Sequence, residues 1–338
     1  MKFYDIISSN QRMGEINLKS FEIGKNDAGQ RMDKFLSKAA PSLPKSLLYK
    51  YLRTKRIKLN GKRAEPASRL NEGDIVELYI NDEFFARKEY HYDFLKAPKK
   101  PDILYEDENI LIINKPPGVL CHPDGDNYTN NLIASVRRYL FEKGEYDPEK
   151  ENSFAPALAN RIDRNTGGLV MAAKNAEALR ILNERIKNRE ITKKYLCVAE
   201  GAFKEKSGVL EGFISLNKSQ NKATVTKKET EDSKAIKTGY TVLKEKNGLS
   251  LLEIELFTGR THQIRAQFAA IGHPLYGDTK YKGKAAGENS PYKKQYLYAY
   301  KLEFSFKTDA GALNYLKDKV FTAPEPEFVA EFNNGKLK

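Results

Sequence analysis

Residues 157–175 read ALANRIDRNTGGLVMAAKN, in which a charged turn separates two largely apolar segments. We interpret this stretch as a strand, a polar turn that ends in Gly167 and Gly168, and a second strand. Paired glycines permit positive φ and a close approach between backbones. Within the turn, Asp163 stands between Arg161 and Arg164, an arrangement that favours a charged carboxylate available as nucleophile or base. The alternative is a structural carboxylate that caps the turn or pairs with an arginine.

Outward from this turn, the patterns predict many strands joined by hairpins, with helices between them. The strongest hairpin signal is Asn247-Gly248 within residues 239–257. Because the strands do not alternate regularly with helices, we predict an α+β fold with no βαβ sheet. The further strands are expected at 103–116, 192–201 and 297–306, the helices at 130–143, 176–191 and 261–272, and a loop within the Lys-, Ser- and Glu-rich region 204–235.

The N-terminal part has a different character, and we predict a separate domain at residues 15–82. Its order is helix, helix, a hairpin at Asn60-Gly61, and a strand. From Arg31 to Arg63 the chain has 11 Lys and Arg and one acid, a net charge of +10. Residues 83–101 are charged, aromatic and followed by proline, so we expect a linker there and a second domain at 102–328.

Composition limits the class of protein. The chain has 338 residues and a formal net charge of +13, which favours a polyanionic partner such as nucleic acid. We find no apolar run long enough for a membrane span, and no signal peptide in the first 15 residues. Two cysteines form no disulfide framework. We therefore expect a cytoplasmic protein that does not associate with membranes.

Four blocks, in order, resemble the RluA family of pseudouridine synthases, particularly its RluC- and RluD-like members. NRIDRNTGGLVMAAK at 160–174 is similar to the family's HRLDRxTSGLLLxAK, and NKPPGVLCHP at 114–123 to its NKPxGxxVHP. GRTHQIR at 259–265 is identical to the family block, and GHPLYGD at 272–278 matches GHPIxGD. Lys194-Tyr195 stands where the family has a Lys-Tyr or Lys-x-Tyr element. The resemblance covers residues 103 to about 307.

This resemblance implies an isomerase with a mixed, largely antiparallel sheet around a cleft. Such an enzyme breaks the N-glycosidic bond of uridine and rejoins the base through C5. Asp163 would attack C1′ or remove the C2′ proton, and the sequence leaves both open. Arg260 would pair with Asp163, and Tyr195 would pack on the target base. We expect substrate contacts from Arg161, Arg164, Ile264, Lys115 and His122.

The sequence departs from the family pattern at three positions. Asn160 replaces a usual His, Gly167 replaces a usual Ser, and Tyr298 stands where a His commonly precedes Ala. The first two flank the turn, so its geometry and the substrate preference stay open. His262 and His273 are 11 residues apart with no Cys or acid at ligand spacing, so we expect no metal and no cofactor.

Three parts of the N-terminal domain resemble an S4 RNA-binding domain, which often precedes this catalytic domain. They are Arg31, Lys34, Phe35 and Leu36, the run IKLNGK at 57–62, and LNEGD at 70–74. Basic residues on paired helices can face phosphates while the hairpin fixes their spacing. We expect a monomer that acts on RNA, with ribosomal RNA of the large subunit first and tRNA second. The alternative is a catalytically silent RNA-binding or ribosome-assembly factor. The expected RNA contacts are Arg31, Lys34, Lys50, Arg53, Lys55, Arg56, Lys58 and Lys62.

Overall fold

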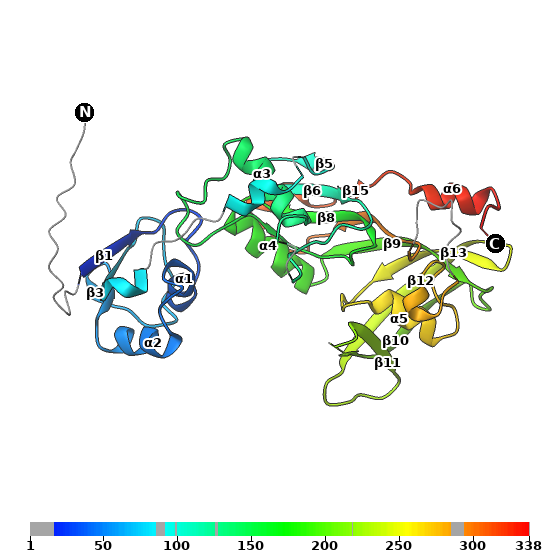
Figure 1. Cartoon of the computed structure of the whole chain (residues 1–338), viewed down its shortest axis with the longest axis horizontal. Coiled ribbons are helices and arrows are strands. Elements are labelled where there is room, and N and C mark those ends of the chain that lie inside the picture. Colours follow the sequence, from blue (N-terminus) through cyan, green and yellow to red (C-terminus); the bar gives the residue numbers. More distant parts are fainter. Residues whose placement is uncertain are drawn as a thin grey trace. The chain divides into compact units, whose positions relative to one another are not determined.

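The structure is a computed structural model that describes residues 17–85, 92–98, 100–125, 128–217, 219–284 and 294–337. The chain forms two compact units, shown in Figure 1. The first unit comprises residues 1–91 and 147–155, and the second comprises residues 92–146 and 156–338. The segment expected as a linker, 83–101, is thus divided between them, although residues 86–91 and 99 lie outside the described part, as do residues 15 and 16.

The first unit pairs a small sheet with two helices. Its strands are β1 (Asn17–Glu22), β2 (Ile57–Leu59), β3 (Lys62–Arg63) and β4 (Ile75–Ile80), in the order β1-β4-β2-β3. Helices α1 (Met32–Ala39) and α2 (Lys45–Arg53) bury Phe35, Leu36 and Leu52 in its core. The hairpin predicted at Asn60-Gly61 is confirmed, because both residues have positive φ between β2 and β3. The strand β1 was not predicted.

Segment 147–155 reaches the first unit from between two parts of the second. Asp27 is 2% exposed and accepts hydrogen bonds from Asn152 Nδ2 at 2.8 Å and Ser153 Oγ at 2.5 Å. Asn152 Nδ2 also donates to the carbonyl of Glu22 at 2.9 Å. The division of the chain changes from one unit to the other after residues 91, 146 and 155. The two units are therefore joined by three chain connections, whereas a single linker would provide one.

The second unit is organised around a sheet that has eleven strands in the described residues. Its main path runs in the order β11-β10-β12-β13-β9-β14-β8-β6-β5, while β7 pairs with β8 and β15 with β14 (Figure 1). Among the strand pairs of the described residues, only β14–β8 is parallel, so the predicted mixed and largely antiparallel sheet is confirmed. The strands are β5 (Ile103–Glu106), β6 (Ile110–Lys115), β7 (Ala157–Leu158), β8 (Gly167–Ala173), β9 (Ile191–Glu200), β10 (Ser207–Asn217), β11 (Lys222–Thr226), β12 (Lys234–Lys246), β13 (Leu249–Leu256), β14 (Leu297–Phe304) and β15 (Val320–Thr322).

In the described part of the second unit, four α-helices accompany this sheet: α3 (Leu132–Glu142), α4 (Ala176–Lys187), α5 (Gln263–Ala270) and α6 (Glu327–Asn333). The side chains of Asn131 and Asn175 cap α3 and α4 by accepting the backbone N–H groups of Ala134 and Ala178. Helix α6 buries Phe328 and Phe332 in the main core, which explains why the second unit extends beyond the expected end at residue 328. Short 3₁₀ helices include η3 (Thr279–Tyr281).

Strands β10 and β11 occupy much of the region 204–235. β11 is the last strand on this side of the sheet, and β10 is next to it. Within the described residues, no helix has the length and apolar character that crossing a membrane requires. The cytoplasmic location stays a prediction.

Candidate active site

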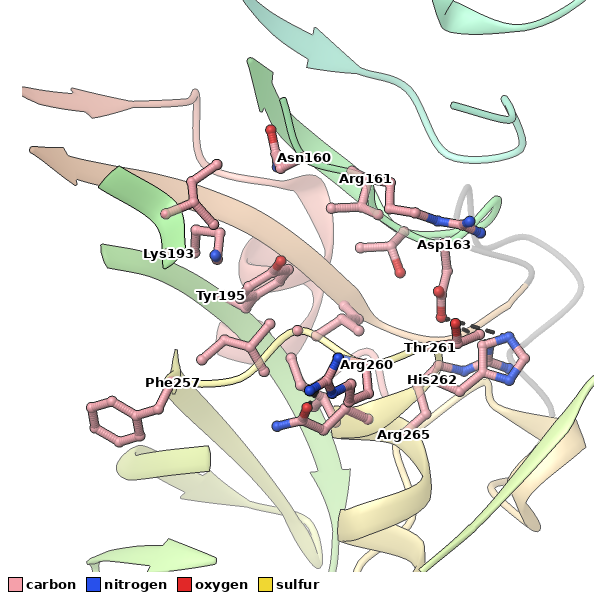
Figure 2. A pocket seen from close by; sticks show the side chains of 18 of the residues that line it. Asn160, Arg161, Asp163, Lys193, Tyr195, Phe257, Arg260, Thr261, His262 and Arg265 are labelled. Carbon is pink, nitrogen blue, oxygen red and sulfur yellow. Dashed lines mark hydrogen bonds and ion pairs between the residues drawn. The ribbon is translucent and has the colours of Figure 1, made fainter. Parts of the chain in front are cut away.

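A pocket of about 340 Å³ opens in the second unit. Its walls come from the turn between β7 and β8, from strand β9, and from the segment that leads from the end of β13 into α5 (Figure 2). Among the described residues that line it, Asp163 is the one acid. The lining residues that the argument uses are Asn160, Arg161, Asp163, Lys193, Tyr195, Arg260, His262, Ile264 and Arg265.

Asp163 faces two nitrogen-bearing side chains. Its Oδ2 lies 3.1 Å from Nη1 of Arg265, which donates a hydrogen bond, and 3.9 Å from Nε2 of His262 (Figure 2). The Asp163 side chain is 21% exposed, so the ion pair is partly shielded from water while one side stays accessible. The predicted turn fixes the backbone of Asp163, because the Thr166 N–H donates a hydrogen bond to the Asp163 carbonyl at 3.1 Å.

Arg265 is itself fixed by a second carboxylate. Its Nε and Nη2 donate to the two oxygens of Asp278 at 2.6 and 2.8 Å, and Asp278 is 2% exposed. Burial pulls the pKa of Arg265 down, but Asp278 and Asp163 outweigh it and the pKa is raised. This bidentate pair orients the remaining guanidinium nitrogen toward Asp163.

The expected pairing of Arg260 with Asp163 is therefore wrong, because Arg265 makes that contact. Arg260 lies on the loop before α5 and lines the pocket. This loop is held by Gln263, whose Oε1 accepts from the Arg260 N–H at 3.1 Å and from Thr258 Oγ1 at 2.9 Å. Both arginines belong to GRTHQIR, but only Arg265 is on the helix that turns toward Asp278.

Strand β9 contributes Lys193 and Tyr195, which lie two residues apart and both line the pocket (Figure 2). Tyr195 is 5% exposed. Burial, reinforced by the Asp163 carboxylate, raises the pKa of Tyr195, so its phenol is protonated at neutral pH. Burial also lowers the pKa of Lys193. The pocket thus combines an aromatic ring with a carboxylate and several cations.

Gly167 and Tyr298, two of the departures from the family pattern, face each other on neighbouring strands. β8 and β14 run parallel, with Gly167 opposite Tyr298. A Cβ atom on Gly167 would lie 2.8 Å from two ring carbons of Tyr298 and 3.1 Å from Pro117 Cδ. The Tyr298 hydroxyl donates to Asn114 Oδ1 at 2.5 Å. The glycine thus makes room for the tyrosine, and the two departures are coupled.

At Gly168, the next residue, a glycine is required for a different reason. Gly168 has φ of 110°, and a Cβ there would lie 2.1 Å from the carbonyl oxygen of Ala299. Asn160, the third departure, lines the pocket wall, and its Oδ1 accepts the Met171 N–H at 2.8 Å. It therefore fastens the start of the turn to β8.

Lys115 does not have the substrate-binding position that we expected. It is fully buried, and its Nζ donates to the carbonyls of Pro116 at 3.0 Å, Val119 at 2.8 Å and Arg164 at 3.0 Å. Burial lowers the pKa of Lys115 to about 8. Lys115 is thus a scaffold that ties the Lys-Pro-Pro-Gly turn to the turn carrying Asp163.

Of the other four expected substrate contacts, two line the pocket and two do not. Arg161 and Ile264 line the pocket, whereas Arg164 and His122 are exposed and are not among the described lining residues. His262 and Lys193 also line the pocket, and the sequence reasoning assigned them no role. Their only sequence signal was membership of GRTHQIR and of the Lys-Lys-Tyr run.

In the first unit, Lys34, Lys50, Arg53, Lys55 and Lys62 are exposed, and none has an ion pair within the described part of the chain. The other three expected RNA contacts are engaged locally. Arg31 pairs with Asp33 at 2.8 Å, Arg56 lies over the Tyr51 ring, and Lys58 lies over the Tyr79 ring.

Comparison with known proteins adds an independent observation. A family profile described as RNA pseudouridylate synthase matches residues 109–270. An uncharacterized RNA pseudouridine synthase of Mycoplasma capricolum is 33% identical over 306 residues, which cover 90% of this chain and 96% of that protein. The ribosomal large subunit pseudouridine synthase C of Haemophilus ducreyi is 29% identical, and the match covers 85% of this chain and 88% of that protein.

Among solved structures, human RNA Pseudouridylate Synthase Domain Containing 4 superposes with a TM-score of 0.53 at 20% identity. The superposition covers 70% of this chain and 93% of that one. At this identity the likeness concerns the fold alone.

Proposed function

Because the chain belongs to the RluA family of RNA pseudouridine synthases, we propose that it isomerises uridines of large-subunit ribosomal RNA with Asp163 as the catalytic carboxylate. The observation that carries this proposal is the position of Asp163, half-buried in the pocket and 3.1 Å from Arg265. A guanidinium at this distance orients the carboxylate that would attack C1′ or remove the C2′ proton.

The composition of the pocket supports isomerisation over hydrolysis. Glycoside hydrolases commonly use two carboxylates, whereas the described lining of this pocket holds only Asp163. Its volume of about 340 Å³ lies near the lower end of the usual range for ligand pockets, roughly 300–1,000 Å³, which suits a single flipped nucleotide. Tyr195 offers a ring on which the base could stack, and its protonated phenol could relay a proton.

The charges around the pocket support an RNA substrate. Arg161, Lys193 and Arg260 all line it, and each could contact a phosphate near the flipped nucleotide. We further propose that the first unit is S4-like and binds RNA through its exposed Lys34, Lys50, Arg53, Lys55 and Lys62. The relative named for the ribosomal large subunit supports ribosomal RNA as the first candidate. All described residues that line the pocket belong to the second unit of one chain, and we propose that the protein acts as a monomer.

A pseudouridine map of cellular RNA tests the substrate. Carbodiimide-induced reverse-transcription stops would be compared between cells that have the gene and cells that lack it. We expect one or a few stops to disappear from large-subunit ribosomal RNA. Stops lost from tRNA alone would contradict the proposed substrate and leave the activity standing. If every stop persists although the protein is expressed and no second enzyme covers the site, the chain does not modify RNA in these cells.

RNA binding by the first unit has its own test. Lys50→Ala with Arg53→Ala should weaken binding of the full chain to ribosomal RNA and lower the slope of log Kd against log salt by about one for each lost phosphate contact. Lys204→Ala, an exposed lysine of the second unit outside the pocket lining, is the matched control. Equal affinity and equal slope in the double variant and the control would show that these residues do not bind RNA.

A further inference from the structure

Tyr281, at the end of η3, contacts both side chains that face Asp163. It is 4% exposed, and its hydroxyl lies 2.9 Å from Nδ1 of His262. The Cζ atom of Arg265 lies 5.1 Å from the centre of its ring, within the range of a cation–π contact. Tyr281 is therefore placed to control how both partners approach the carboxylate, although it does not line the pocket itself.

The hydrogen bonds of Tyr281 indicate where the imidazole proton of His262 lies. The Ala223 N–H donates to the Tyr281 hydroxyl oxygen at 2.8 Å. If His262 Nδ1 also donated to this oxygen, the buried O–H would need another acceptor, and the described residues offer none. If instead the O–H donates to Nδ1, every group is satisfied. The imidazole proton then lies on Nε2, the nitrogen 3.9 Å from Asp163 Oδ2.

The backbone of His262 supports a functional reason for this arrangement. His262 precedes α5 with φ of 57° and ψ of 19°, a left-handed conformation that is unfavourable for residues with a Cβ. A strained residue at a pocket is a reason to look for a function of its side chain. Burial lowers the pKa of His262, more than the Asp163 carboxylate raises it, so the ring is neutral at neutral pH.

We propose that Tyr281 is a positioning residue that holds neutral His262 with its Nε2–H directed at Asp163. This inference rests on the proposed catalytic role of Asp163. In this tautomer a donor faces the carboxylate, whereas the opposite tautomer would present a lone pair and repel it. The distance of 3.9 Å exceeds a hydrogen bond, and contacts of this kind often tighten when substrate binds. Asp163 thus faces one donor at hydrogen-bond distance, Arg265, and a second group at 3.9 Å, His262, and both contact Tyr281.

Tyr281→Phe tests the proposal because it retains the ring under Arg265 and removes only the hydroxyl. The tautomer is read from the imidazole ¹⁵N shifts of the full chain, with the His262 signals assigned by their loss in His262→Gln. We expect Nε2 to carry the proton in the unmodified protein and the two tautomers to mix in Tyr281→Phe. We also expect kcat to fall by roughly 10- to 100-fold, with KM within about twofold, because a small misplacement at a reacting centre is costly.

Tyr240→Phe is the matched control, because it loses a hydroxyl of the same unit outside the pocket lining and should keep kcat. A proton on Nδ1 in the unmodified protein would overturn the proposal even if Tyr281→Phe fails to fold. So would a folded Tyr281→Phe with unchanged kcat. Loss of activity in Asp163→Asn beside full activity in Tyr281→Phe refutes only this inference, whereas an active Asp163→Asn refutes the proposed function itself.

Discussion

Replacing Gly167 with alanine should destabilise the second unit through one contact. The new Cβ would lie 2.8 Å from Cδ2 and Cε2 of Tyr298, closer than carbon atoms pack in protein interiors. Tyr298 is 6% exposed, so its ring has little room to move. Moving it would also weaken the hydrogen bond from its hydroxyl to Asn114.

The magnitude follows from three contributions. Overpacking costs roughly 1–3 kcal/mol, and loss of one hydrogen bond costs about 1 kcal/mol. The reduced entropy of the unfolded chain returns about 0.4–1 kcal/mol. We therefore expect Gly167→Ala to lower the free energy of unfolding by about 1–3.5 kcal/mol. Tyr298→His, which restores the residue usual in the family, should remove most of this cost and give a coupling energy of about 1–2 kcal/mol.

Urea unfolding followed by circular dichroism measures both values in a double-mutant cycle. Gly259→Ala is the matched control, because a Cβ at Gly259 would have no atom within 4 Å. If Gly167→Ala behaves like Gly259→Ala, the close approach to Tyr298 is not real. If its cost is the same with His at position 298, the two departures from the family pattern are independent and our explanation fails.

Three further changes separate the roles assigned around the turn. Arg265→Gln should destabilise the protein by about 3–5 kcal/mol because it leaves Asp278 buried and unpaired. Arg260→Gln should change the free energy of unfolding by no more than about 0.5 kcal/mol. Equal thermal denaturation of the two variants would contradict the assignment of Arg265. Lys115→Met should cost about 2–4 kcal/mol by leaving the Pro116 and Val119 carbonyls without a donor and the Arg164 carbonyl with only the Gly118 N–H. Its residual activity should show an unchanged KM, and a KM raised tenfold in a stable variant would restore the role of Lys115 in substrate binding. Gly168→Ala should lower the yield of folded protein severely, because the Cβ would meet the Ala299 carbonyl at 2.1 Å; a folded variant with normal melting temperature would show that β8 and β14 are not so close.

Local patterns were sufficient for several elements. Asn60-Gly61 and Asn247-Gly248 both form the expected turns, since each pair adopts the positive φ that such hairpins need. The periodic runs that became α3 and α4 carry their own caps in Asn131 and Asn175. In these segments, the residues that determine the structure are neighbours in the sequence.

Other features depend on contacts that the sequence does not display. The choice between Arg260 and Arg265 is decided by Asp278, which lies 13 residues after Arg265 and meets its guanidinium only in the folded protein. Lys115 is the last residue of the apolar strand β6, where a charged side chain is ordinary, and its full burial depends on carbonyls from two separate turns. A loop was expected within residues 204–235, and strands β10 and β11 in that region were not predicted. Their position at one side of the sheet leaves many of their residues exposed, with little apolar alternation to recognise.

The proposed role of Asp163 is tested by single-turnover release of tritium from RNA labelled at C5 of uridine, using Asp163→Asn and the unmodified enzyme. The substitution keeps the shape of the side chain, and Arg265 keeps its bidentate partner Asp278, so the fold and RNA affinity should be retained. We expect tritium release to fall by more than about 10⁴-fold while the Kd for RNA stays within about threefold. Release within tenfold of the unmodified enzyme, with the same RNA bound equally well, would show that the carboxylate of Asp163 does not perform the chemistry.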